Sequence, residues 1–133
     1  FIQGVPIECV NEAAVRYHVP ASVILSVLKT ERGKTGMASP NANGTLDLGP
    51  MQVNSLWLKK IKSYGVSAEK LRNDPCVNVA VGTWILSQSL AASGSYWTGV
   101  ANYHSHTPTF NQSYQQKIRH QFNALTKVID DPI

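Results

Sequence analysis

Glu31 is the residue whose type and setting most clearly suggest chemistry. It follows Leu28 by three positions and Ile24 by seven, so on a helix it continues the apolar face toward the core. Loss of hydration at such a place favours the protonated form of a carboxyl group, which can donate a proton to a glycosidic oxygen. A simpler interpretation is a glutamate in a last helical turn that reaches solvent or pairs with Lys29 or Arg32. Glu31 alone does not decide between the two.

The segment 47–54, Asp-Leu-Gly-Pro-Met-Gln-Val-Asn, is a second candidate. Gln52 and Asn54 flank one apolar residue, so an extended backbone directs both amides to the same side. Amide groups combine donors and acceptors, which suits sugar hydroxyls and N-acetyl groups. A polar turn capped by Asp47 explains the same residues without any ligand.

A third cluster lies at 101–106, Ala-Asn-Tyr-His-Ser-His. The His104-x-His106 spacing invites a metal site, but no Asp, Glu or Cys is nearby in sequence. We therefore expect surface or hydrogen-bonded histidines, and neither a metal nor a cofactor. Tyr103, near the end of an expected helix, can line a groove or pack in the core. Core packing is also what we expect of the tryptophans, Trp57, Trp84 and Trp97.

Composition narrows the classes of function. The chain has 133 residues, 43% of them hydrophobic, which fits a single domain with a substantial core. Its formal charge is +4, and no run of basic residues exceeds Lys59-Lys60, which argues against nucleic-acid binding. A mild positive charge favours approach to an anionic polymer such as a bacterial wall. No apolar run is long enough to span a membrane, and there is neither a nucleophile elbow nor a glycine-rich phosphate loop.

The two cysteines, Cys9 and Cys76, do not form a C-x-x-C pair, so neither a zinc site nor a redox motif is indicated. Their spacing leaves open whether they are two buried thiols or one disulfide. The chain starts at Phe1 without the charged and apolar regions of a signal peptide. We expect a mature chain from which such a peptide has been removed.

The elements that must position these residues are mostly helices. Periodicity, proline and capping residues predict helices near 6–17, from about 20 to a stop at Gly33, and near 55–63, 74–94, 95–103 and 110–129. Ser67 is expected to cap a short turn that ends near Arg72. Residues 33–50 are rich in Gly, Asn, Ser and Pro and predict a loop, in which Thr45–Leu48 alternates as in a small hairpin. The expected fold is one mostly α domain, residues 1–133, with at most a small β-hairpin. The last helix should face the core with Phe110, Tyr114, Ile118, Phe122, Leu125 and Ile129.

Together these segments resemble the lytic transglycosylases of the goose-type lysozyme-like superfamily. The resemblance is greatest to the small specialised members that accompany secretion and conjugation machines. It covers nearly the whole chain, including Thr-Glu-Arg-Gly at 30–33, Gly-Pro-Met-Gln-Val-Asn at 49–54, Asp-Pro-Cys-Val-Asn at 74–78 and Tyr-His-Ser at 103–105. The fold that it implies is a mostly helical, lysozyme-like α+β domain.

The resemblance implies roles for particular residues. Glu31 corresponds to the single catalytic acid of the family. Gln52, Asn54 and Met51 correspond to substrate-binding residues of the glycan cleft, and Tyr103 corresponds to the aromatic residue beside the acid. No metal or cofactor is implied.

Two further features come from the same resemblance. Cys9 and Cys76 correspond to a pair that is disulfide-bonded in this subgroup, which favours a disulfide here. The chain also departs from the family pattern: Arg32 stands where Ser usually follows the acid, Pro50 replaces a common Leu, and His104 replaces Asn. These departures bear on the rate and the contacts in the cleft rather than on the fold.

The implied reaction is cleavage of the β-1,4 bond between N-acetylmuramic acid and N-acetylglucosamine with formation of a 1,6-anhydro product. Glu31 would act first as acid and then as base. One alternative is a hydrolytic goose-type lysozyme, for which Asp47 is the one candidate for a second carboxylate. Another is a weakly active peptidoglycan-binding module of a secretion machine. We expect a monomer in the periplasm or outside the cell, acting on peptidoglycan strands beside a secretion or conjugation apparatus.

Overall fold

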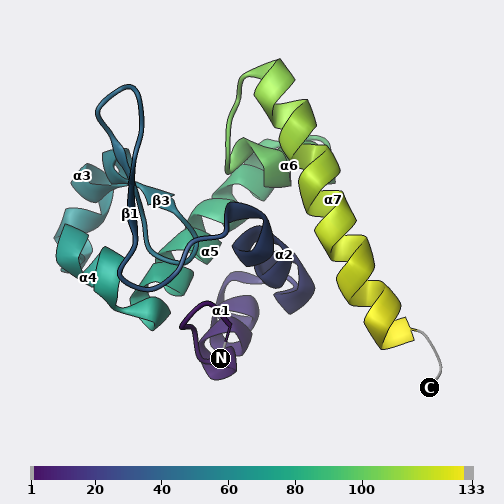
Figure 1. The fold of residues 1–133 in the computed structure, drawn as a ribbon, viewed down its shortest axis with the longest axis horizontal. Coiled ribbons are helices and arrows are strands. Elements are labelled where there is room, and N and C mark those ends of the chain that lie inside the picture. The colour runs from purple at the N-terminus through teal and green to yellow at the C-terminus, as the bar shows by residue number, and fades with distance from the viewer. Residues whose placement is uncertain (1, 131–133) are drawn as a thin grey trace.

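The computed structural model describes residues 2–130, and side chains as far as residue 126. Helices dominate these residues, as the sequence predicts, and a short three-stranded sheet accompanies them (Figure 1). The α-helices are α1 (Ile7–Tyr17), α2 (Ala21–Glu31), α3 (Leu58–Ile61), α4 (Ala68–Asn73), α5 (Pro75–Ala92), α6 (Tyr96–Asn102) and α7 (Pro108–Asp130). The strands are β1 (Ala38–Pro40), β2 (Leu46–Leu48) and β3 (Val53–Asn54), and two short 3₁₀ turns, Ser55–Trp57 and Lys62–Tyr64, flank α3.

Helix α5 forms the centre of the molecule. It begins where the sequence predicts, because the Asp74 carboxylate accepts hydrogen bonds from the backbone N–H groups of Cys76 and Val77, and Pro75 occupies the first turn. Most of its residues from Asn78 to Leu86 are buried, as expected of a helix enclosed by others. Helices α1, α4 and α6 all pack against it, and α7 packs along α2 and α6.

The sheet lies on one side of α5 with α3 and α4, and α6 and α7 lie on the other side (Figure 1). Its strand order is β1-β2-β3, with both pairs antiparallel. Asp47 pairs with Ser39 on one neighbouring strand and with Asn54 on the other. The hairpin expected around 45–48 is present and gains a third short strand.

Asn78 connects the sheet region to α5. It is fully buried, and its side-chain oxygen accepts a hydrogen bond from Met51 N at 2.8 Å. Its amide nitrogen donates to the carbonyl oxygens of Leu48 and Leu71, both at 2.8 Å. One buried side chain therefore satisfies three backbone groups and fixes the segment 48–51 against α5.

A disulfide joins Cys9 of α1 to Cys76 of α5, with Cα atoms 5.3 Å apart, as the family resemblance implies. It links residues 67 positions apart in sequence and ties the N-terminal helix to the central one. Neither cysteine is free.

Two expectations about helix faces and ends were wrong. Phe110 was expected in the core but is 61% exposed, because the first turn of α7 extends to the rim of a surface pocket and no other element covers it. Tyr114 and Ile118, farther along the same stripe, are buried as predicted, whereas Ile129 is outside the described side chains. Helix α2 ends at Glu31 rather than at Gly33, because Arg32 already adopts the left-handed conformation, with φ of 58°.

Among the described residues, no helix combines the length and apolar character needed to cross a membrane.

Candidate active site

Glu31 is the last residue of α2, and its side chain is 12% exposed. The predicted apolar face of this helix is confirmed, since Val23, Ile24, Val27 and Leu28 are all buried. Glu31 lines a pocket of about 470 Å³ between the sheet region and the α6–α7 connection. The carboxyl group therefore sits at the edge of the core with one side open to a cleft, the setting expected of a proton donor.

The end of α2 is fixed by contacts from distant segments. The Gln3 amide donates hydrogen bonds to the carbonyl oxygens of Leu28 and Gly33, the first at 2.9 Å. A Cβ atom at Gly33 would lie 2.6 Å from the carbonyl oxygen of Pro50 and 3.0 Å from the Gln52 side chain. Only glycine therefore allows the turn 49–52 to pass this close behind Glu31. The capping role of Gln3 carries no signal in the local sequence.

Gln52 and Asn54 both line this pocket with Glu31. The extended backbone expected for this pair is found at Asn54, in β3, but not at Gln52. Gln52 lies in a tight turn with φ of 52°, and its amide nitrogen donates to Gly49 O at 3.0 Å. The Asn54 amide donates to Asp47 Oδ1 and Thr45 Oγ1, each at 3.1 Å. These contacts orient both amides and leave the carboxylate of Asp47 bound within the sheet.

Tyr103 and Met51 contribute to the candidate site in different ways. Tyr103 lines the pocket, and its hydroxyl donates to the carbonyl oxygen of Met51 at 2.7 Å. The Met51 side chain was expected to touch substrate, but it is fully buried and packs against Gly82, where a Cβ would lie 2.5 Å from its sulfur. Met51 thus supports the site from behind through its backbone. Its position could not be deduced locally, since an exposed turn and a buried one share the same sequence pattern.

His104 faces Glu31 directly. Its Nδ1 atom lies 3.5 Å from Oε2 of Glu31, and its ring stacks on that of Tyr114 with centroids 4.5 Å apart and planes 10° from parallel. The hydrogen bond to Glu31 raises the pKa of His104, and the negative charges of Glu31 and Asp47 act in the same direction. Partial burial and the charge of Lys117 oppose this rise in pKa. His104, expected to be a surface or hydrogen-bonded histidine, is therefore paired with the candidate acid, a partner that the sequence did not indicate.

Two tyrosine hydroxyls complete the environment of Glu31. Burial raises the pKa values of Tyr103 and Tyr114 well above the ordinary value, and the Glu31 charge adds to both shifts. Both hydroxyls therefore stay protonated and able to donate hydrogen bonds at neutral pH. The Tyr114 hydroxyl is buried without a hydrogen-bond partner among the described residues. The sequence pattern assigned Tyr114 to the apolar stripe of α7 and therefore did not identify its hydroxyl as a polar group near Glu31.

Other sequence candidates lie elsewhere. His106 does not line the pocket with Glu31. The tryptophans pack against the hydrophobic core as expected, with Trp57 and Trp84 edge to face at 5.8 Å and Trp97 against Phe122 at 5.2 Å. In the described residues, no three His, Cys, Asp or Glu side chains gather as metal ligands would.

The chain matches a known protein family and several known proteins in sequence. The family model described as "Transglycosylase SLT domain" matches residues 8–125. The chain is 30% identical over 123 residues to "Invasion protein IagB" of Salmonella typhimurium (strain SL1344), covering 89% of this chain and 77% of that protein. It is 31% identical over 101 residues to "Protein IpgF" of Shigella sonnei, covering 75% of this chain and 66% of that protein. It is 24% identical over 132 residues to the "Peptidoglycan-binding-like protein" of Escherichia coli O157:H7, covering 90% of this chain and 79% of that protein.

Proposed function

Because the chain belongs to the transglycosylase SLT domain family and is therefore a peptidoglycan lytic transglycosylase, we propose Glu31 as its catalytic acid. The proposed reaction cleaves the β-1,4 bond between N-acetylmuramic acid and N-acetylglucosamine and forms a 1,6-anhydro product. The observation that carries the residue assignment is the placement of Glu31. It is a largely buried carboxyl group that opens into a cleft lined by the amide-bearing Gln52 and Asn54. Amide groups of this kind match the hydroxyl and N-acetyl groups of the glycan.

The proposed reaction uses one protein carboxyl twice. Glu31 donates its proton to the oxygen of the leaving N-acetylglucosamine as the glycosidic bond breaks. The N-acetyl group of the muramic acid supports the developing positive charge at the anomeric carbon. Glu31, now a carboxylate, takes the proton of the 6-hydroxyl of the same sugar, whose oxygen bonds to the anomeric carbon. The proton is returned to Glu31, and no water is consumed.

The surroundings of Asp47 favour this route over hydrolysis. A hydrolytic enzyme would need a second carboxylate to hold and activate a water molecule. Asp47 lines the same pocket, but its Oδ1 atom accepts a hydrogen bond from the Asn54 amide, across the β2–β3 pair. Asp47 is therefore engaged in holding the sheet, which suits a bracing role.

The relatives and the disulfide support the biological setting that we propose. Two relatives carry the names "Invasion protein" and "Peptidoglycan-binding-like protein". Disulfides such as Cys9–Cys76 persist in oxidising compartments. We propose that the protein acts on peptidoglycan in the periplasm or outside the cell, and we keep the sequence-based expectations of a monomer and of a neighbouring secretion or conjugation apparatus.

The test is the Glu31→Gln variant on purified sacculi. Glutamine keeps the shape and hydrogen-bonding capacity of the side chain but transfers no proton, so release of anhydro-muropeptides should fall by about a hundred- to ten-thousand-fold. Mass spectrometry identifies the products, and thermal melting verifies the fold. Glu12→Gln, at an exposed position of α1, is the matched control and should behave as wild type.

Two results would count against the proposal. A folded Glu31→Gln variant that works near the wild-type rate would remove Glu31 as the acid. Reducing-end products from the wild type would identify a hydrolase and restore Asp47 as a candidate.

A further inference from the structure

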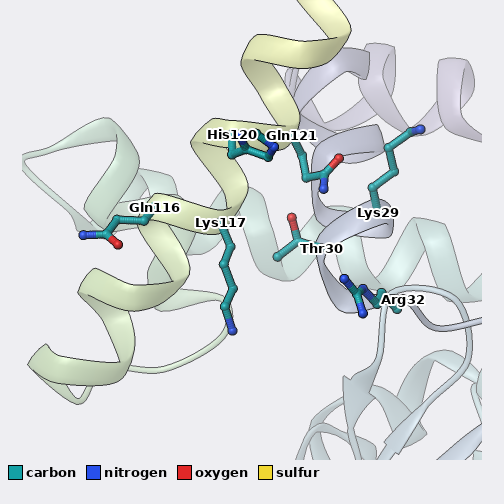
Figure 2. Close-up of a pocket in the computed structure, with 7 residues that line it drawn as sticks. All are labelled: Lys29, Thr30, Arg32, Gln116, Lys117, His120 and Gln121. Atoms are coloured by element: carbon teal, nitrogen blue, oxygen red, sulfur yellow. The ribbon is translucent and has the colours of Figure 1, made fainter.

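A second pocket, of about 580 Å³, lies between the end of α2 and the middle of α7. Figure 2 shows Thr30 and Arg32, at the end of α2, opposite Lys117 and His120 of α7. Lys29 of α2 also lines the pocket, with its side chain extending away from α7 in this view. We call this the basic pocket. Its lining includes two lysines, an arginine and a histidine, but no carboxylate. Thr30, Gln116 and Gln121 complete the lining.

The cationic groups are available to a ligand. Lys29, Arg32 and Lys117 are all exposed, and none has a carboxylate within ion-pair distance in the part of the chain that the structure describes. Lys29 and Arg32 could simply offset the negative end of the α2 dipole. Lys117 has no such role, because it lies in the interior of α7.

The basic pocket adjoins the candidate active site. Glu31 lies in sequence between Thr30 and Arg32, which line the basic pocket, while Glu31 itself lines the catalytic one. The charge of Lys117 also reaches the catalytic pocket, since it lowers the pKa of His104. The catalytic pocket, with Glu31 and Asp47, contains the carboxylates, and the basic pocket contains the cations.

A glycan strand lying across Glu31 would bring its substituents to this boundary. The muramic acid sugars of peptidoglycan carry short peptides with free carboxylates, and these are the anionic groups of the strand. We propose that the basic pocket binds the carboxylates of these peptide stems, so that the enzyme distinguishes strands with stems from strands without them. This inference rests on the proposed function, because it concerns the same polymer.

The test compares two substrates: glycan strands that carry peptide stems, and strands from which an amidase has removed them. The double variant Lys29→Gln/Lys117→Gln removes two cations from the basic pocket. The matched control, Lys59→Gln/Lys62→Gln, removes two exposed lysines that line neither the basic nor the catalytic pocket, so the change in net charge is identical.

Two exposed ion pairs should together raise the preference for stem-bearing strands by about fivefold. The ratio of kcat/KM on stem-bearing to denuded strands should fall by that factor in the double variant and stay at the wild-type value in the control. High salt should remove the wild-type preference, since the charges are exposed.

Binding measured in the Glu31→Gln background separates this proposal from the proposed function. Fluorescently labelled strands of both kinds report affinity even if no cleavage occurs. A wild type that cleaves neither strand overturns the proposed function, while the affinity ratio still tests the basic pocket. The stem proposal is overturned if the double variant keeps the wild-type ratio of affinities for the two strands, or if the control changes this ratio equally. A wild-type ratio in the double variant would point to an acidic protein partner instead.

Discussion

Replacing His104 by Asn should remove one ionisation from the pH–activity profile. The imidazole faces Glu31, with Nδ1 and Oε2 3.5 Å apart, and this pairing raises the pKa of His104. Below that raised pKa a positive charge therefore lies beside the candidate acid, and above it the imidazole is neutral. Asparagine is uncharged at every pH, so the variant should lack the change in rate that accompanies this ionisation.

The size of this change in rate follows from the geometry. Two unit charges at this separation interact by about 1 kcal/mol in water and by about 5 kcal/mol at an effective dielectric constant of 20. The His104 side chain is 45% exposed, so the aqueous value applies more closely. An interaction of about 1 kcal/mol corresponds to a change in rate of about fivefold.

The assay is kcat/KM for anhydro-muropeptide release between mildly acidic and alkaline pH. His106→Asn is the matched control, because His106 is exposed and lies outside the pocket. It should retain the wild-type profile. If the profile of His104→Asn overlaid that of the wild type while the variant stayed folded, the charge of His104 would have no influence on catalysis.

The same pair also predicts pH-dependent stability. The folded-state pKa of His104 is raised above its ordinary value of 6.5, so its pairing with Glu31 should stabilise the fold below that pH and lose this effect as the pH rises through the folded-state pKa. Melting temperatures of wild type and His104→Asn should therefore converge at alkaline pH, and a constant difference would contradict this prediction. Reducing the Cys9–Cys76 disulfide should lower the free energy of unfolding by about 4 kcal/mol, because the disulfide closes a long loop and so limits the entropy of the unfolded chain. A loss below about 1 kcal/mol in urea titrations would contradict this entropy argument. Asn78→Ala should lower the free energy of unfolding by about 3 kcal/mol or more, because it leaves three buried backbone groups unpaired. Denaturant titration measures this loss, and a loss near zero would mean that water replaces the amide. Gln52→Ala should weaken turnover by about 1 kcal/mol with little loss of stability, whereas an early melt at full activity would make Gln52 purely structural.

Much of the fold could be predicted from the sequence, because its signals are local. Asp74 and Pro75 start α5, and Ser67 caps α4 by accepting a hydrogen bond from Lys70 N, as their residue types predict. The apolar spacing of α2 placed Glu31 at the edge of the core. Each of these inferences depends on neighbours within one or two helical turns, whose geometry the helix itself fixes.

The family resemblance, rather than spacing, predicted the disulfide and the grouping of Glu31 with Gln52, Asn54 and Tyr103. The structure brings these four residues to one pocket. Their catalytic and binding roles remain predictions for the variants described above.

The positions that sequence reasoning missed all depend on contacts between distant segments. His104 meets Glu31 because the α6–α7 connection and the end of α2 converge, and neither segment alone indicates this. Met51 is buried because Gly82 of α5 leaves room for its side chain, whereas Phe110 is exposed because no element packs over the first turn of α7. Periodicity shows which face of a helix is apolar, but not whether another element arrives to cover it. Sequence determined the helices and the candidate acid; only tertiary packing decided the partners of that acid and the charged pocket beside it.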